Sequence, residues 1–595
     1  MSNLDIRAES NMKSGYVDGN ERKPTDCFFC ILFLAFLMAL VTISFIGIAK
    51  GNWRLLVAGT DADGHICGSD VENGAYKDYR NVYYMTGLSN GLKLSDGAIC
   101  VKDCPNKDAA TLNCVPTTNV PNCQISQQYA TVEFIGYCLP SKFGDNNGPV
   151  QSEWDKVMGI QAVNNFFKDL DIASTAIYVS FVLGLFYTLC YLYFLSSCAH
   201  VLAYVAIGLL EVIMIAGIGG LAYGLSQVGN DADAKKGYYI AIAINAFFLL
   251  LFNCLMCCFW SKLQVAIAVI DCTADFMAAT KRIALLTIYF FLLSIVVTVI
   301  WAFGLVGTIS MNEITAVRAE DGNGYVKQIS WTGGTTAMLC MMIFGFIWVI
   351  AFISDQARFV YMLGASQYYY SSGPEGEGSA SLMGAVSIAN TKHSGSLALG
   401  SLLHTIVVVL RMIVDAIVNA SEKQSGDNAA VKIIGCLLKC CVRCLESLIE
   451  YLNATAYAYM SVSGDPYCRS AWNGFLINLK HLMEFYFADV LAGMFVFIGV
   501  LLIVGLNMGS CFLIMRYGLK NSDKLGSIWV PLALIGVTTL ITAELFIGFF
   551  HQALKATLMS MAIDIELHGK ATRGSPSFHE KMERINGKSD DDSRG

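Results

Sequence analysis

The sequence has little charge for its length. Only 15% of its 595 residues are Asp, Glu, Lys or Arg, whereas 55% are hydrophobic, and the mean hydropathy is +0.52. A soluble domain carries charge on about 25% of its residues, so this composition excludes a soluble protein and indicates a polytopic membrane protein. The formal net charge is −7, and no basic stripe indicates binding to nucleic acid.

Signatures of catalysis are also lacking. The sequence contains no GxxxxGK[ST] phosphate loop and no HExxH zinc motif. Its eight histidines form no cluster with the spacing of metal ligands. We therefore expect no enzyme activity, no metal site and no cofactor.

Long apolar runs are abundant. A crossing helix needs about 20 apolar residues. Eight runs meet this requirement: 27–49, 172–195, 200–225, 238–260, 284–309, 335–357, 488–514 and 528–552. Two more, 396–418 and 433–463, are interrupted by charges. Either both of these cross or both lie along the surface as amphipathic helices, because an odd count would separate the two tails. We predict an all-α polytopic membrane protein with about ten transmembrane helices.

The domain organisation follows from these spans. Residues 1–26 are polar, so we expect no cleavable signal peptide. The predicted units are a disordered N-terminus at 1–26, the first helix at 27–49, a loop at 50–171, helices two to six at 172–357, a loop at 358–395, a membrane region with helices seven to ten or amphipathic segments at 396–565, and a disordered tail at 566–595. Composition is the basis for predicting disorder at both ends.

Loop charge assigns the two sides of the membrane, because Lys and Arg accumulate in cytosolic loops. Arg22 and Lys23 precede the first helix, Arg282 precedes the fifth, and Lys570 and Arg573 follow the last. All five positions share one side in a ten-helix arrangement. We assign this side to the cytosol, which places both termini there and the 50–171 loop outside.

The 50–171 loop contains an even number of cysteines, namely Cys67, Cys100, Cys104, Cys114, Cys123 and Cys138. Three disulfides in an oxidising, extracellular setting are the natural interpretation. Six cysteines allow fifteen pairings, and the sequence does not choose among them. Reduced thiols or a zinc site are the alternative, although the loop contains no CxxC pair.

A second group of cysteines has a different setting. Cys436, Cys440, Cys441 and Cys444 lie beside basic residues in a segment that resembles a membrane-interface helix. They are candidates for palmitoylation, although such cysteines also serve as small buried hydrophobic residues. Asn419 begins an N-x-[ST] sequon and is a candidate for glycosylation.

An acid lies near the middle of the 200–225 run. Placing Glu211 at the centre of a crossing helix costs about 2.5–3.5 kcal/mol. The acid could neutralise a basic partner, carry protons or balance a cationic solute, or it could be a protonated packing residue.

Trp301 and Trp348 lie inside later spans, and an indole face attracts quaternary ammonium, although tryptophans in spans also serve in packing. We predict that Glu211, Trp301 and Trp348 bind the substrate.

A second acid, Glu544, lies about one helical turn past the midpoint of the last run. Arg411 in the 396–418 run is one predicted partner across the bundle, which would leave Glu211 for the solute. Arg411 could equally pair with Asp415, four residues further along its own helix.

The C-terminal half of the sequence resembles the choline transporter-like family. The motifs are 395-GSLALGSL-402, Arg411, 436-CLLKCCVRCLE-446, 452-LNATAY-457 and 468-CRSA-471. Further matches are 59-GTDADGHICG-68, 97-GAICVKDCP-105, the Trp348 helix and 528–550. The likeness extends from about residue 24 to about residue 570.

The resemblance implies a ten-helix carrier with cytosolic termini and a disulfide-bonded first extracellular loop. It implies sodium-independent movement of choline, and in some members ethanolamine, across plasma or organelle membranes, without a cofactor. The segment 363-LGASQYYY-370 lacks a tryptophan that is common in the family, which bears on solute preference. We interpret the protein as a facilitative carrier of choline or a related organic cation, embedded in membrane lipids. The alternative is a non-transporting scaffold or receptor that acts through the disulfide loop.

Overall fold

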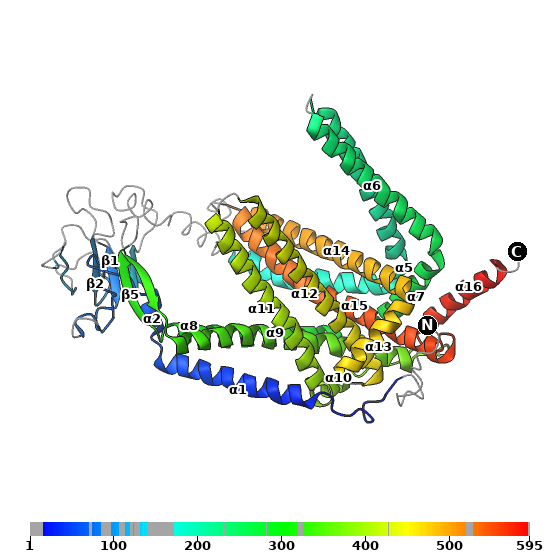
Figure 1. The fold of residues 1–595 in the computed structure, drawn as a ribbon, viewed down its shortest axis with the longest axis horizontal. Coiled ribbons are helices and arrows are strands. Elements are labelled where there is room, and N and C mark those ends of the chain that lie inside the picture. Colours follow the sequence, from blue (N-terminus) through cyan, green and yellow to red (C-terminus); the bar gives the residue numbers. More distant parts are fainter. Residues whose placement is uncertain are drawn as a thin grey trace.

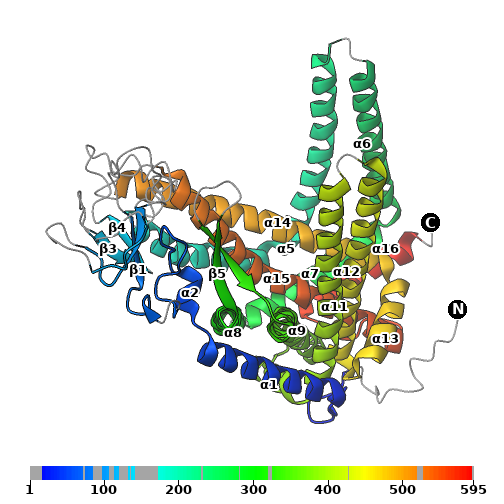
Figure 2. The same cartoon turned by 60° about the vertical axis from the view of Figure 1, so that its left-hand side comes forward.

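The computed structural model is a bundle of long helices with a small disulfide-linked domain at one end (Figure 1). It describes residues 16–592 except 71–73, 85–96, 106–112, 119–122, 124–130, 135, 141–171, 230–231, 281, 319–324, 426–427 and 519–526. The start of α1 (Cys27–Lys50) and the whole of α16 (Pro576–Asp592) lie at the other end of the bundle (Figures 1 and 2). We call this end the termini side.

Nine helical spans among the described residues are long and apolar enough to cross a membrane. Four of the spans are whole helices: Cys27–Lys50 (α1), Ile283–Ile309 (α8), Gly333–Ser371 (α9) and Trp529–His568 (α15). Two spans, Ser174–Leu195 and Val201–Gln227, are the two halves of α5 (Ser174–Gln227). The remaining three are Asp233–Cys258 in α6 (Ala232–Cys258), Ser394–Gln424 in α11 (Ser394–Ser425), and Leu482–Gly518, which combines α14 (Leu482–Leu513) with the turn η3 (Ile514–Gly518). This arrangement confirms the predicted all-α polytopic class.

A further long helix, α12 (Ala429–Ser463), packs alongside α11. α12 is not among the candidate spans because charged residues interrupt its apolar sequence. One of these charges has a partner on α11, where Arg411 Nη1 donates to both carboxylate oxygens of Glu446, at 2.9 and 2.7 Å. The structure thus pairs Arg411 with neither Glu544 nor Asp415. The two interrupted runs of the sequence form one antiparallel helix pair with these charges matched across the seam.

The long helix α5 is broken at Cys198, where φ −130° and ψ 20° are not helical. Its second half forms a hairpin with α6, and this hairpin stands away from α8 and α9 in both views (Figures 1 and 2). At the base of the hairpin, Phe259 has φ −118° and leads into α7 (Trp260–Ala279). α7 is mostly buried and packs against α5, α14, α15 and α16.

The disulfide-linked domain is built on a four-stranded sheet. Its strands are β1 (Asn81–Tyr84), β2 (Ala98–Val101), β3 (Thr131–Phe134) and β4 (Tyr137–Pro140), in the order β2-β1-β4-β3. Three disulfides, Cys67–Cys100, Cys104–Cys138 and Cys114–Cys123, join it. They confirm the prediction of three bridges and supply the pairing that the sequence left open. The predicted loop's last part, 141–171, lies outside the described residues.

A short helix and a hairpin connect this domain to the bundle. They are α2 (Trp53–Val57) and the antiparallel pair β5 (Glu313–Arg318) and β6 (Tyr325–Ser330). Lys327 Nζ donates to the carbonyls of Leu55 and Leu56 at 2.9 and 2.8 Å. Burial lowers the pKa of Lys327 to about 8, which means that the partly buried site disfavours the charged ammonium.

The termini side is more ordered than the sequence predicted. The segment 358–395, expected as a loop, contains the end of α9 and all of α10 (Leu382–Thr391). The tail expected to be disordered from 566 contains the end of α15 and α16. α16 is anchored on α7, because Lys581 donates to Asp271 and Ser577 Oγ donates to Asp275 at 2.6 Å. The structure therefore describes helices within 566–592, a segment for which composition predicts disorder.

The N-terminal segment is also docked. Arg22 is only 2% exposed, and its guanidinium donates to the carbonyls of Met460 and Ser461 at 3.1 and 2.6 Å, at the C-terminal end of α12. Asp26 accepts hydrogen bonds from Ser396 Oγ and the Tyr467 amide at 2.6 and 2.8 Å, where α13 (Tyr467–Lys480) begins. The structure thus describes contacts to the bundle within residues 16–26, where composition predicts disorder, and residues 1–15 lie outside the described part.

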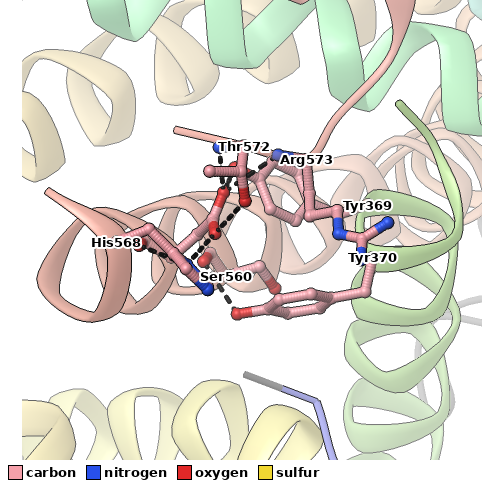
Figure 3. Close-up of polar contacts among 7 residues, drawn as sticks. Tyr369, Tyr370, Ser560, His568, Thr572 and Arg573 are labelled. Atoms are coloured by element: carbon pink, nitrogen blue, oxygen red, sulfur yellow. Dashed lines mark hydrogen bonds and ion pairs between the residues drawn. The ribbon is translucent and has the colours of Figure 1, made fainter. Parts of the chain in front are cut away.

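A polar cluster ties α9 to α15 on the termini side (Figure 3). Its centre is Asp564, which is fully buried. The Asp564 carboxylate accepts hydrogen bonds from the amides of Thr572 and Arg573 at 2.6 and 3.0 Å and from the Tyr369 hydroxyl at 3.2 Å. The Tyr370 hydroxyl donates to the Ser560 carbonyl at 3.0 Å. The chain after α15 is thereby folded back onto both helices.

Candidate functional site

Trp348, predicted as a wall of the substrate site, lies in the seam between α1, α9 and α11. It is 2% exposed, and its Nε1 donates to the Ala398 carbonyl at 3.3 Å. Its ring contacts Phe33 and Phe36 with centroid separations of 5.2 Å each. These are the contacts of a helix-packing residue.

Trp301, the second predicted wall, joins α8 to α9. Its indole stacks on Phe346 with ring centroids 4.0 Å apart and an interplanar angle of 19°. Its Nε1 donates to the Met342 carbonyl at 2.9 Å. One face of this indole is therefore already occupied by a phenyl ring.

Glu211 lies in the second half of α5, on the hairpin with α6. The side chain is half-buried, and within the described residues its carboxylate has no hydrogen-bond or ion-pair partner. Because the hairpin stands away from α8 and α9 (Figure 2), the structure does not bring Glu211 together with Trp301 or Trp348. A role for Glu211 in substrate binding remains a prediction.

A cavity of about 620 Å³ lies between α8, α9, α14 and α15. Small-molecule sites typically have volumes of about 300–1,000 Å³, so it is large enough for a small organic ligand. We call it the Glu544 cavity. Its lining includes the aromatic residues Phe290, Phe291, Tyr361 and Phe549, the hydroxyl residues Thr287, Ser294 and Ser354, and the acid Glu544.

Glu544 supplies a charge without a partner. It is the sixteenth residue of α15, about 22 Å along a helix that rises 1.5 Å per residue, which places it near the middle of the span. In the part of the chain that the structure describes, its carboxylate makes no hydrogen bond and no ion pair. A carboxylate at such a depth is costly unless a partner or water meets it, so this position is suited to a cation that enters the cavity.

A buried amide oxygen lies on the same wall. Gln552 Oε1 is enclosed and finds no hydrogen-bond donor among the described residues. Glu544, Gly548 and Gln552 all line the cavity, and their spacing of four residues puts them on one face of α15. An unpaired buried polar group costs about 1–3 kcal/mol, so a ligand that carries a hydroxyl or N–H donor would be stabilised here.

Aromatic rings form much of the remaining wall. The Tyr361 hydroxyl lies 3.0 Å from Thr287 Oγ1, and its ring tilts against Phe549 with centroids 5.4 Å apart. Phe290 is buried, whereas Phe291 is 38% exposed. Ring faces attract cations through their quadrupole, by up to about 2 kcal/mol where water is excluded. The cavity therefore combines an unpaired acid with aromatic surface.

The basic groups at the edge of the cavity are already paired. Arg358 lies 3.6 Å from Asp355 and 3.7 Å from Glu450. His551 Nε2 lies 2.6 Å from Asp489 Oδ1. Because these contacts balance the basic groups, Glu544 gives the cavity an excess of negative charge.

The sequence offered part of this site. The sequence indicates Glu544 as a second intramembrane acid and leaves Arg411 to pair with either Glu544 or Asp415, whereas in the structure Arg411 binds Glu446. Gln552 was missed. The four-residue spacing of Glu544, Gly548 and Gln552 is the signal that could have indicated a polar stripe on one helix face.

The predicted modification sites lie on α11 and α12. Cys436, Cys440, Cys441 and Cys444 are free thiols and exposed on α12. Asn419 lies within α11, and its Oδ1 accepts a hydrogen bond from Lys439 Nζ at 2.9 Å. Palmitoylation and glycosylation remain predictions.

The structure is thus a polytopic helical bundle with a charged, aromatic-lined cavity between four of its helices. A family model described as "Plasma-membrane choline transporter" matches residues 240–566, more than half of the chain. The chain therefore belongs to the plasma-membrane choline transporter family, a family of membrane transporters. α8, α9, α14 and nearly all of α15 lie within the matched region.

Individual relatives match along nearly the whole chain at low identity. "Choline transporter-like protein 2" of Dictyostelium discoideum is 24% identical over 606 residues, with 92% of this chain and 92% of the relative covered. The human protein of the same name is 22% identical over 658 residues, with 92% of each chain covered. The likeness therefore includes the disulfide-linked domain as well as the bundle.

Proposed function

We propose that the protein is a facilitative, sodium-independent carrier of choline or a related organic cation such as ethanolamine, and that the cation binds in the Glu544 cavity. The observation that carries this proposal is the partnerless Glu544 carboxylate in a cavity with aromatic walls. Membership of the choline transporter family supports the substrate class.

The chemistry of the cavity suits a quaternary ammonium. Such a group donates no hydrogen bond, so it must be recognised by charge, by aromatic faces and by the size of the cage. Glu544 supplies the charge, and Phe290, Tyr361 and Phe549 supply ring surface. The cation's own positive charge balances the acid, so a co-bound sodium ion is not required for neutrality.

Gln552 gives a reason for preferring alcohols. Choline and ethanolamine share a hydroxyl two carbons from nitrogen, and this hydroxyl can donate to the unpartnered Gln552 Oε1 once a change of side-chain rotamer turns this enclosed atom into the cavity. Tetramethylammonium lacks the donor and should bind more weakly. Sites built to satisfy a substrate hydroxyl discriminate strongly against analogues without it.

We further propose that the protein lies in the plasma membrane with the termini side in the cytosol. Three disulfides in the opposite domain favour an oxidising, extracellular environment for that end. Arg22, Lys23, Lys570 and Arg573 then lie on the side where positive charge accumulates.

The test is uptake of labelled choline by the full-length protein in liposomes, with and without sodium. Glu544→Gln should lower the apparent affinity for choline at least about tenfold. Two unit charges about 4 Å apart attract by about 4 kcal/mol at an effective dielectric constant of 20, and desolvation offsets only part of this. Glu580→Gln is the matched control, because Glu580 is an exposed acid of α16 that pairs with Arg584.

Two outcomes would contradict the proposal. If Glu544→Gln transports choline like the Glu580→Gln control, the cation does not bind at Glu544, and the parallel variant Glu211→Gln would show whether the hairpin acid serves instead. If correctly folded wild-type protein moves no amine at all, the scaffold or receptor interpretation of the disulfide-linked domain gains support.

A further inference from the structure

A second, smaller cavity of about 220 Å³ lies between α12, α13, α14 and α15. It has an acid, Asp489, and three aromatic side chains, Tyr451, Phe485 and Tyr486, in its wall. This is the same combination of carboxylate and ring surface that the Glu544 cavity shows. We call it the Asp489 cavity.

The two cavities share one side chain. His551 lines both of them. It is seven residues after Glu544 on α15, about 10 Å further towards the termini side at 1.5 Å per residue. The Asp489 cavity thus adjoins the Glu544 cavity at His551 and lies further along α15 towards the termini side.

Asp489 differs from Glu544 because it is held by two basic groups. His551 Nε2 lies 2.6 Å and Lys555 Nζ lies 3.2 Å from the same oxygen, Oδ1. No described residue makes a hydrogen bond to the second oxygen, Oδ2. The Asp489 side chain is 53% exposed and Lys555 is 28% exposed, so both groups can be reached from the cavity.

We propose that the Asp489 cavity is a second cation-binding station, in which the transported ammonium displaces Lys555 from Asp489. This inference rests on the proposed function and adds a step to it. Lys555 carries a primary ammonium on a flexible stem, so it pairs with the carboxylate in most molecules when the substrate is absent. Conduction needs sites that bind strongly enough to be entered and weakly enough to be left. Competition from Lys555 makes the second station weak and thereby promotes release.

The competition has a measurable consequence. A site that is free in only a fraction of molecules shows an affinity reduced by that fraction. If Lys555 occupies Asp489 in about nine molecules of ten, removing its charge raises the apparent affinity of this station about tenfold. A lysine that merely supports the fold would give no gain in affinity when it is replaced.

The experiment measures binding of radiolabelled choline to the purified full-length protein. All variants carry Glu544→Gln, so that the remaining binding reports the second station. Adding Lys555→Met should tighten this binding about tenfold, and adding Asp489→Asn should abolish it. Adding Lys555→Arg keeps a cation beside Asp489 and should leave the binding as in the parent. Thermal unfolding and size-exclusion chromatography check that each variant is folded.

Transport gives a second readout that does not need the Glu544→Gln background. Lys555→Met alone should lower both the apparent KM and the maximal rate, because the cation leaves the second station more slowly. Residual binding that is equal with and without the Lys555→Met change, or that survives Asp489→Asn, would overturn the inference. If only this inference is wrong, the wild-type protein still transports choline and still binds it through Glu544. If the proposed function is wrong, both the transport and the Glu544-dependent binding are absent.

Discussion

Acidification should release the docked N-terminal segment through His393. This residue is fully buried immediately before α11. Its Nδ1 lies 3.1 Å from Thr25 Oγ1, and its Nε2 lies 3.4 Å from Arg22 Nη1. Burial, together with the neighbouring Arg22 guanidinium, lowers the pKa of His393 to about 3. The folded protein therefore keeps this imidazole neutral under conditions in which a solvated histidine takes up a proton.

The size of the effect follows from the two pKa values. The ordinary pKa of histidine is 6.5, so between pH 6.5 and 3 the undocked state binds a proton that the docked state excludes. The stability of docking is fully present above pH 6.5 and falls with acidification. Each pH unit costs about 1.4 kcal/mol, which gives about 2 kcal/mol at pH 5, or about a 30-fold change in the opening equilibrium.

Hydrogen–deuterium exchange of residues 16–26 measures this opening, once intrinsic exchange rates at each pH are corrected for. Protection in the wild type should fall about 30-fold between pH 7 and pH 5. His393→Gln keeps a polar side chain that does not titrate, and its protection should be nearly independent of pH. The reasoning fails if the wild type shows no such loss, or if His393→Gln loses protection to the same extent.

Two further substitutions test the assignments of buried residues. Trp348→Ala should lower stability by about 3–5 kcal/mol, as expected for a large core residue, and the loss should appear in thermal unfolding; reduced choline affinity at unchanged stability would instead restore Trp348 as a substrate wall. Arg411→Met should destabilise by about 1–3 kcal/mol because it leaves Glu446 unpaired at the α11–α12 seam. Adding Glu446→Gln should recover part of that loss, and strictly additive effects of the two changes would refute the pairing.

The membrane helices could be predicted because their signal is local. A run of about 20 apolar residues is sufficient evidence for a span, and the even number of cysteines was sufficient for three disulfides. The disulfide pairing could not be predicted, because it depends on which strands of the sheet meet. The Cys67–Cys100 disulfide lies next to the β1–β2 pair and joins residues that are 33 positions apart in sequence.

The local sequence does not indicate that the segments on the termini side are structured. Residues 16–26 and 569–585 are polar, and composition alone therefore predicts disorder. Their structure comes from single side chains that reach distant elements. Arg22 binds carbonyls at the end of α12, more than 430 positions away, and Ser577 binds Asp275, 302 positions away. Such contacts become visible only when the helices have been assembled.

The sequence alone also could not indicate which of the two intramembrane acids, Glu211 or Glu544, lines the Glu544 cavity. Hydropathy ranks Glu211 and Glu544 alike, since both interrupt apolar runs near their centres. What separates them is the packing of their helices: α15 contacts α9, α14, α5, α7 and α12, whereas the second half of α5 stands with α6 outside the bundle. Glu544 is exposed but lines a cavity between α8, α9, α14 and α15, and the sequence of its own run does not reveal these neighbours.

The polar cluster around Asp564 constrains how the Glu544 cavity can open. It joins α9 and α15, two walls of the cavity, through Tyr369 and through the Tyr370 to Ser560 bond (Figure 3). Opening the α9–α15 seam on the termini side would break the hydrogen bonds made by the Tyr369 and Tyr370 hydroxyls, whereas the amides of Thr572 and Arg573 would stay on Asp564; each lost bond costs about 0.5–1.5 kcal/mol. The other two walls, α8 and α14, do not take part in this cluster. The hydroxyl contacts of Tyr369 and Tyr370 must therefore break, or α9 and α15 must move together, when the cavity opens on the termini side.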